Sequence, residues 1–282
     1  MKPPILMQTD FSRNSSAVAA MLGVCQSVDP EVNIFDGNHA IPPFNVFVAS
    51  TNLAYLADFW PMGTVFVSVV DPGVGTSRRG SVALLKNGQY VVTPDNGTLT
   101  HLQRTVGVQA IREIDMTVNR WPTTETCNIF HGRDVFAYTA IRLASGIIDF
   151  EGVGPAYPLE EMVIIDYDEA LYQAEKDAFT GVIHSAHPHF GLVCSNIPAS
   201  EVKGRWELNY GDLLEVTVTR GSQVIFQETL PFQHSFGYVD IGQPLLFISS
   251  SLEMELAMRN DNIVEKYGIE AGPEWRMQIK RA

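Results

Sequence analysis

The chain has 282 residues, of which 45% are hydrophobic and 18% charged, so we expect a sizeable packed core and exclude wholesale disorder. A net charge of −13 argues against non-specific nucleic-acid binding, which requires a basic face. The cysteines, Cys25, Cys127 and Cys194, are far apart, so we expect neither a disulfide framework nor a cysteine zinc site, and we predict a reducing cytoplasmic setting. We also expect no targeting peptide and no membrane span.

The first half of the chain alternates strand-like and helix-like segments. Hydrophobic periodicity predicts strands at residues 5–8, 31–35, 65–70, 81–85 and 90–93. The same analysis predicts helices at residues 15–28, 45–59 and 134–144. This alternation predicts an α/β domain over residues 1–165, with a central, largely parallel sheet flanked by helices.

The pattern changes after about residue 150. Residues 152–158 are rich in Gly and Pro and residues 166–177 are polar and acidic, so we predict a linker at residues 166–178. Short alternating segments then predict strands at residues 181–184, 213–219, 223–228, 244–249 and 254–258. The sequence therefore predicts an all-β domain over residues 179–282.

Polar residues follow several predicted elements of the first domain. Ligands bind open α/β sheets beyond the carboxyl ends of the strands. Asp10 follows the first strand and can accept hydrogen bonds from a ribose diol, or cap the next helix. Asp71 ends a buried strand and can pair with Arg78, either within a site or only to stiffen the loop. His131 and Gly132 precede a helix whose start favours an anion or an oriented water, although a single histidine is more often structural.

Other candidates carry weaker signals. Pro94-Asp95-Asn96-Gly97 is a turn sequence, and turn formation is sufficient to explain it. Phe44 and Phe236 can stack on a flat ligand, although most phenylalanines belong to the core. Three histidines of the second half invite a metal site, but no neighbouring carboxylate or cysteine completes a zinc set, so we expect no metal. They are His184, His187 and His189.

Several of these segments, taken together and in order, resemble the S-adenosyl-L-methionine hydroxide adenosyltransferases, relatives of fluorinase and chlorinase. The matching segments are Thr9-Asp10-Phe11 and residues 39–44, 71–76, 94–97 and 130–134. The second half follows more loosely, through Phe190-Gly191 and residues 248–251. The resemblance implies an α/β N-terminal domain, a β C-terminal domain, a small-molecule nucleoside substrate without a cofactor, and a homotrimer with substrate bound between neighbouring subunits.

The resemblance implies that water attacks C5′ of S-adenosylmethionine, yielding adenosine and methionine. It assigns the handling of water to Asp71, Arg78 and His131, and it places Gly132 at the nucleophile pocket. The sulfonium departs as a neutral thioether without an acid, so activation of water is the difficult part. A guanidinium favours hydroxide character, and either Asp71 or His131 can orient the water and take its proton.

The resemblance also implies contacts to the substrate. Asp10 would bind the ribose, Phe44 would lie beside the sugar and sulfonium, and Phe236 would stack on the adenine. The methionine carboxylate would be held by Ser250 and Ser251.

The chain also departs from its family. The halogenating relatives have a tyrosine where this chain has Asp71, whose charge would repel a halide and favour water. The family pattern D-x-x-F-G-N becomes residues 187–192 here, with His187 at the position that meets the methionine ammonium and Leu192 at the position that reaches the adenine edge. Neither side chain offers a carboxylate or amide, so we expect altered recognition. Two alternatives therefore stay open, a non-catalytic adenosine-binding protein and a hydrolase of a different 5′-substituted adenosine.

Overall fold

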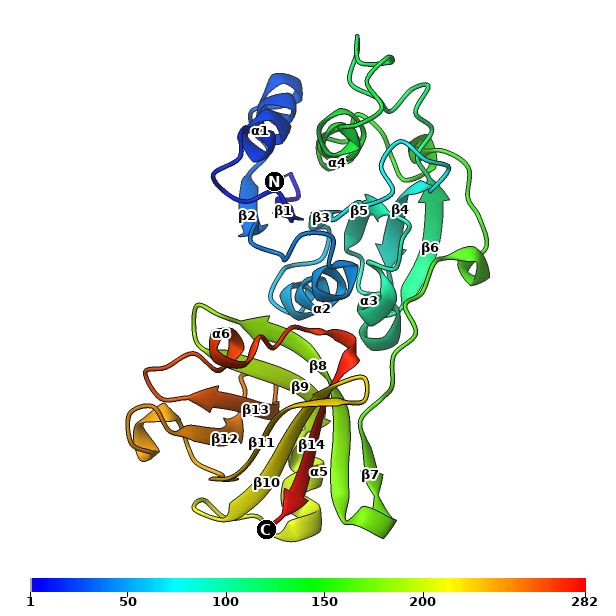
Figure 1. Cartoon of the computed structure of the whole chain (residues 1–282). Coiled ribbons are helices and arrows are strands. Elements are labelled where there is room, and N and C mark those ends of the chain that lie inside the picture. The colour runs from blue at the N-terminus through cyan, green and yellow to red at the C-terminus, as the bar shows by residue number, and fades with distance from the viewer. Residues whose placement is uncertain (1) are drawn as a thin grey trace. The chain divides into compact units, whose positions relative to one another are not determined.

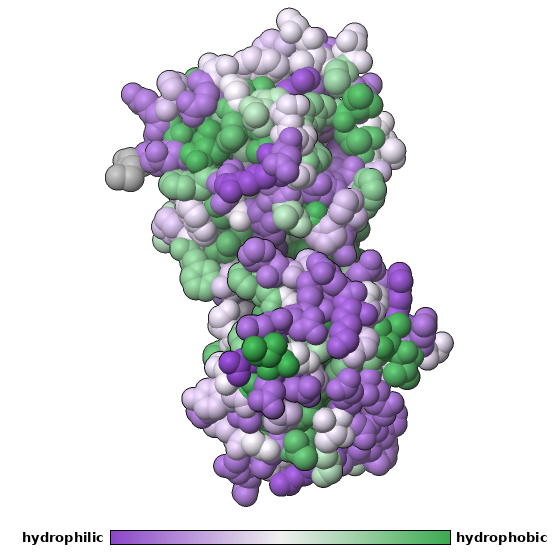
Figure 2. All heavy atoms as spheres, turned by 60° about the vertical axis from the view of Figure 1, so that its left-hand side comes forward, coloured by the Kyte–Doolittle hydropathy of each residue, from purple (hydrophilic) through white to green (hydrophobic). Residues whose placement is uncertain are grey.

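The computed structural model describes residues 2–282. Its internal contacts divide the chain into two compact units, and the division falls between Ile165 and Asp166. Within the described residues, no helix is both long and apolar enough to span a bilayer. In the view of Figure 2, hydrophobic residues form separate patches among hydrophilic ones on both units.

In the described part of the N-terminal unit, six strands form one sheet in the order β2-β1-β3-β5-β4-β6. The strands are β1 (Ile5–Thr9), β2 (Ile34–Asn38), β3 (Val65–Val69), β4 (Gly80–Leu85), β5 (Tyr90–Pro94) and β6 (Val108–Glu113). Strand β1 is parallel to β2 and β3, and β3 is parallel to β5. The sheet is mixed, so the prediction of a largely parallel sheet is confirmed for β1, β2, β3 and β5 but not for β4, which is antiparallel to its neighbours β5 and β6. The reason is local, because the tight turn Lys86-Asn87-Gly88 joins β4 directly to β5 and permits only an antiparallel hairpin.

Helices cover both faces of this sheet, as the sequence predicted. Figure 1 shows α1 (Ser16–Val28) and α4 (Tyr138–Ala144) over one face, and α2 (Val46–Ala57) and α3 (Thr100–Thr105) over the other. Successive strand residues point to opposite faces, so β1 contributes to two cores. Ile5 and Met7 pack in the core that contains residues of α1 and α4, whereas Leu6 packs in the core that contains Leu53 and Leu102.

Two of the predicted boundaries differ from the structure. Strand β2 begins at Ile34 and not at residue 31, because Asp29 Oδ1 accepts the N–H of Glu31 at 3.0 Å and holds that segment in a turn. The helix predicted from residue 134 begins as a π-helical turn, Gly132–Ala137, which continues into α4. The sequence analysis missed the short elements α3 and β6.

The C-terminal unit is built on an antiparallel sheet, with strand order β11-β10-β14-β8-β9-β13-β12. The strands are β7 (Leu171–Gln173), β8 (Ala178–His187), β9 (Leu192–Pro198), β10 (Leu213–Arg220), β11 (Gln223–Pro231), β12 (Pro244–Ile248), β13 (Glu253–Met258) and β14 (Gly272–Arg281). A bridge between Phe232 and Leu246 brings the two ends of the sheet near to closing. Strand β7, within the segment predicted as a linker, pairs with β8.

The second unit also contains two short helices, α5 (Ala199–Trp206) and α6 (Ile263–Tyr267). The prediction of an all-β domain therefore describes the sheet and not every element. Strands β9 and β14 were missed by the sequence analysis. Strand β9 is buried along almost its whole length and so lacks an alternating pattern. Strand β14 does alternate between buried and partly exposed positions over residues 275–280, a strand signal that the prediction overlooked.

Candidate active site

Asp10 directly follows β1, where the carboxyl ends of the parallel strands meet. Its Oδ2 accepts the backbone N–H of Phe44 at 2.9 Å. Phe44 has a positive φ of 65°, and its side chain is mostly exposed, at 71%. The carboxylate of Asp10 therefore holds a strained loop that presents an aromatic ring.

A hydrogen-bond relay, from the exposed Asp36 through the buried His39 and Thr9, fixes the backbone beside Asp10. Burial lowers the pKa of His39, so its ring is neutral at neutral pH. The neutral ring donates from Nε2 to Asp36 Oδ1 at 3.2 Å and accepts the Thr9 hydroxyl proton at Nδ1 at 2.9 Å. Thr9 Oγ1 in turn accepts the N–H of Phe11 at 3.1 Å. The sequence analysis assigned no role to His39. The feature that pointed to this residue was its place in the segment 39–44, which resembles a family motif.

Asp71 and Arg78 form a buried ion pair just beyond β3. Arg78 Nε donates to Asp71 Oδ1 at 2.9 Å, and Nη2 donates to Oδ2. Their side chains are only 5% and 12% exposed, respectively. The guanidinium also lies over the ring of Phe136, 5.1 Å from the ring centroid. A two-point pair of this kind fixes both the position and the plane of the carboxylate.

His131 completes this cluster. Arg78 Nη2 donates to His131 Nδ1 at 3.2 Å, so in the neutral ring Nε2 carries the proton. Burial, followed by the charge of Arg78, lowers the pKa of His131 and favours that neutral ring. Within residues 2–282, the buried Nε2 has no hydrogen-bond partner. One guanidinium therefore joins a carboxylate and an imidazole whose N–H is available for a ligand.

Glycines allow the three motifs to meet. A β carbon at Gly132 would lie 3.2 Å from Phe11 Cε2 and 3.3 Å from Val69 Cγ1, so this backbone packs against the ends of β1 and β3. Gly75 has φ of 76°, and a β carbon there would lie 2.6 Å from the carbonyl oxygen of Asn128. The structure thus brings together Asp71, Arg78, His131 and Gly132 from segments that are distant in the sequence.

The described part of the N-terminal unit contains hollows of similar size in different places. One of about 280 Å³ is lined by Arg13 and residues 36–40, including the relay histidine His39. Another, of about 350 Å³, is lined by residues such as Pro3, Tyr90 and Phe150. It lies at the amino ends of the strands and contains none of the predicted site residues. The candidate site is therefore identified by the polar residues that follow the strands, and not by the size of a cavity.

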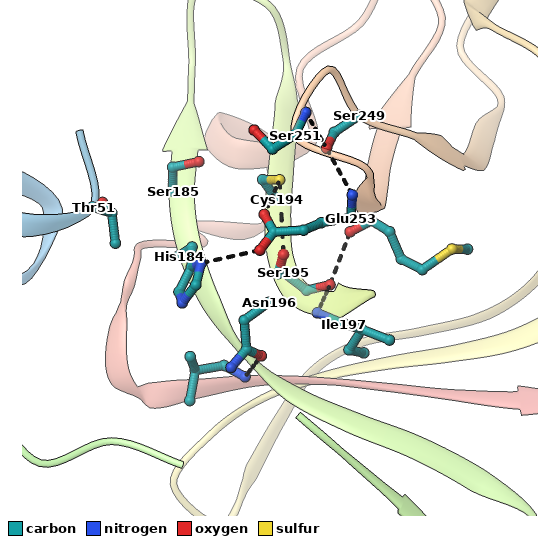
Figure 3. A network of polar contacts seen from close by, with 12 residues as sticks. Thr51, His184, Ser185, Cys194, Ser195, Asn196, Ile197, Ser249, Ser251 and Glu253 are labelled. Atoms are coloured by element: carbon teal, nitrogen blue, oxygen red, sulfur yellow. Dashed lines mark hydrogen bonds and ion pairs between the residues drawn. The ribbon is translucent and has the colours of Figure 1, made fainter. Parts of the chain in front are cut away.

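Ser250 and Ser251 lie on the turn between β12 and β13 in the C-terminal unit. The buried Ser249 Oγ accepts the N–H groups of Ser251 at 3.1 Å and Glu253 at 3.2 Å (Figure 3). Leu252 in the same turn has φ of 63°. Both predicted serines are exposed on a turn that a third serine organises.

Glu253 anchors this turn to the neighbouring strands. Its carboxylate lies 3.6 Å from His184 Nδ1 on β8 and accepts the Cys194 thiol of β9 at 3.5 Å (Figure 3). Burial raises the pKa of Cys194, so the thiol keeps its proton. Burial and then the nearby charge of Glu253 raise the pKa of Glu255 to about 7.

The remaining candidates also lie in the C-terminal unit. His187 is exposed at the end of β8, with Nε2 2.9 Å from Ser185 Oγ. Phe236 is half-buried and packs on Phe247, with ring centroids 5.0 Å apart. Over residues 2–282, no cluster of three or more His, Cys, Asp or Glu side chains is arranged to hold a metal ion.

The chain matches known proteins along nearly its whole length. Residues 5–154 match the SAM hydroxide adenosyltransferase N-terminal domain and residues 186–276 the C-terminal domain. A Salinispora tropica protein named (R)-S-adenosyl-L-methionine hydrolase is 32% identical, with 98% of this chain and 97% of the relative covered. A fluorinase of Actinopolyspora mzabensis is 23% identical, with 98% and 97% covered. The crystal structure of an uncharacterized conserved protein from Thermotoga maritima superposes with a TM-score of 0.85 at 31% identity, covering 98% of this chain and 100% of that one.

Proposed function

The chain belongs to the SAM hydroxide adenosyltransferase family, and from that premise we propose that it hydrolyses S-adenosyl-L-methionine to adenosine and L-methionine. The observation that carries the proposal is the buried Asp71–Arg78–His131 cluster at the carboxyl ends of the parallel strands. Relatives that bear the name of this hydrolase, at 30% to 36% identity, support it.

In the proposed step, a water oxygen attacks C5′ of the substrate. The C5′–S bond breaks with its electron pair going to sulfur, so methionine leaves as a neutral thioether. The water loses one proton, and the products are adenosine, methionine and that proton. As written the step needs only water and substrate, and we propose no cofactor for it.

The geometry supports a distinct role for each residue of the cluster. Because Nδ1 of neutral His131 accepts from Arg78, its Nε2–H is the group available to orient the water oxygen. Asp71 keeps lone pairs beyond its two bonds to Arg78 and is the better acceptor for the water proton. The positive charge of Arg78 stabilises the developing hydroxide. We therefore propose Asp71 as the base.

The carboxylate of Asp71 also supports hydrolysis over halogenation. Its side chain is 5% exposed and paired with Arg78, and the lone pairs that it keeps are hydrogen-bond acceptors. A halide has no proton to donate to these lone pairs, whereas a water molecule can donate a hydrogen bond to them. Water is therefore the favoured nucleophile.

We propose the substrate contacts on the same family premise. Asp10 binds the ribose hydroxyls, Phe44 lies along the sugar, and Gly132 lines the nucleophile pocket. Phe236 stacks on the adenine. Ser250 and Ser251 hold the methionine carboxylate, and His187 lies at the position that faces the methionine ammonium.

The assembly and location are also proposals. We propose a homotrimer with substrate bound between neighbouring subunits, as the family resemblance implies. The cytoplasmic location is still a prediction, based on the number and spacing of the cysteines in the sequence.

A second candidate function is a non-catalytic adenosine-binding protein. The observation that favours it is His187, an exposed imidazole at the position where the family pattern has a carboxylate. An imidazole is a poor partner for the ammonium of methionine. The same substitution supports a hydrolase for a 5′-substituted adenosine that lacks this amine.

Incubation of the purified protein with S-adenosylmethionine in water enriched in heavy oxygen separates these functions. Hydrolysis releases adenosine that carries the heavy oxygen at C5′, and Asp71→Asn abolishes the release. Tight binding of adenosine without turnover would instead support the second candidate. Faster turnover of a deaminated analogue than of S-adenosylmethionine would indicate the alternative substrate.

A further inference from the structure

The turn Pro94-Asp95-Asn96-Gly97 has no role in the reaction proposed above, yet it contacts the segment that carries the ion pair. Asn96 Nδ2 donates to the carbonyl oxygen of Val70 at 2.8 Å. Val70 is completely buried and lies one residue beyond β3, directly before Asp71. A buried carbonyl beyond the end of a strand needs a donor, and the Asn96 amide supplies one.

A second hydrogen bond, to the amide oxygen of Asn96, fixes the orientation of this amide. The buried Thr98 hydroxyl donates to Asn96 Oδ1 at 2.8 Å. The opposite amide orientation would place Oδ1 against the carbonyl oxygen of Val70, two acceptors in contact. Asn96 therefore holds the peptide plane that precedes Asp71 in a single orientation.

The neighbouring turn residue holds the other end of the loop. The backbone N–H of Asp95 donates to the carbonyl oxygen of Arg79 at 2.9 Å, and Arg79 directly follows Arg78. The carboxylate of Asp95 is itself held by the Tyr157 hydroxyl at 3.0 Å. Two successive turn residues, Asp95 and Asn96, thus tie down both ends of the segment 71–78.

We propose that Asn96 is a positioning residue for the hydrolysis, which orients the carboxylate of Asp71 toward the attacking water through the Val70 peptide. The inference rests on the proposed function. A displacement of the reacting groups by about 1 Å can cost up to about 100-fold in rate. The hydrogen bond from Asn96 acts on the water-activating residues and not on the ribose-binding Asp10. Loss of this hydrogen bond should therefore lower kcat and leave KM nearly unchanged.

The test compares Asn96→Ala with Asn87→Ala. Asn87 lies in the turn at the other end of the β4–β5 hairpin, where its Oδ1 accepts the N–H of Gln89 at 3.2 Å. We expect Asn96→Ala to lower kcat by about 10- to 100-fold with KM within about twofold, and Asn87→Ala to leave both within about twofold. An unchanged kcat in Asn96→Ala, an equal loss in both variants, or a loss confined to KM would overturn the inference.

A second readout does not depend on turnover. Arg78 contacts both Asp71 and His131, so a displaced pair should shift the imidazole NMR signals of His131 in Asn96→Ala but not in Asn87→Ala. A wild-type protein that releases no adenosine would refute the proposed function, and these signals would still test the positioning. Signals identical to wild type in Asn96→Ala would overturn the inference.

Two further variants serve if Asn96→Ala fails to fold. Asn96→Asp keeps the acceptor for Thr98 but can donate to Val70 only when its carboxyl is protonated. Its kcat relative to wild type should therefore rise as the pH falls. Thr98→Val removes only the bond that orients the amide, and we expect a smaller loss of kcat, about 2- to 10-fold. Wild-type kcat in both variants would overturn the proposal.

Discussion

Replacement of Arg78 by lysine is the sharpest test of the proposed cluster. The guanidinium bonds Asp71 through Nε and Nη2 and bonds His131 through Nη2, and a compact ammonium cannot reproduce this planar fork. A hydrogen bond that involves a charged group contributes about 1.5–3 kcal/mol. The side chains of Asp71 and Arg78 are only 5% and 12% exposed, so water can replace little of a lost hydrogen bond. The loss of one such bond from the transition state therefore lowers kcat by about 10- to 150-fold.

The assay measures initial rates of adenosine release at saturating S-adenosylmethionine, together with thermal unfolding of each variant. Arg79→Lys is the matched control, because Arg79 pairs at 2.7 Å with Glu161 while the two side chains are 34% and 50% exposed. Such surface pairs contribute about 0–1 kcal/mol, so kcat should stay within about twofold. A wild-type kcat in Arg78→Lys, or an equal decrease in both variants, would show that the fork does not serve the reaction.

Three other predictions concern pH and backbone geometry. Burial lowers the pKa of His131, so the neutral imidazole predominates above the ordinary histidine value of 6.5. We therefore expect kcat to fall as the pH drops below that value. A pH profile of His131→Gln should lack this acidic decline. Gly75→Ala should lower the free energy of unfolding, measured by denaturant titration, by about 1–3 kcal/mol, because the positive φ and a neighbouring carbonyl exclude a β carbon. Gly204→Ala on α5, where an added β carbon would meet no atom within 4 Å apart from its chain neighbours and its own helix backbone, should instead add about 0.5–1 kcal/mol to that free energy. A similar loss in both glycine variants would contradict this argument. The pKa of Glu255 is raised from 4.5 to about 7, so the free energy of unfolding should decrease as the pH rises through this interval. This pH dependence should be missing in Glu255→Gln. The same pH dependence in both proteins would refute the raised pKa of Glu255.

Hydrophobic periodicity was enough to predict the alternating strands and helices of the N-terminal unit and to predict where its site lies. The apolar run at residues 65–70 has no alternation, as expected for a strand buried on both faces, and β3 lies inside the sheet between β1 and β5. The polar residues Asp10 and Asp71 each follow such a strand. The carboxyl ends of neighbouring parallel strands share one edge of a sheet, so the chain order already predicted a site there.

The family resemblance grouped Asp71, Arg78 and His131, but the contacts that join them became visible in the folded chain. Arg78 and His131 are 53 positions apart, and no local pattern indicates that one guanidinium joins that imidazole to Asp71. The contact of Asn96 with Val70 and the position of β14 between β10 and β8 were equally absent from the sequence pattern. Hydrophobic periodicity records which face of an element is buried, whereas the partner of that face depends on how all the elements pack, which is a property of the whole chain.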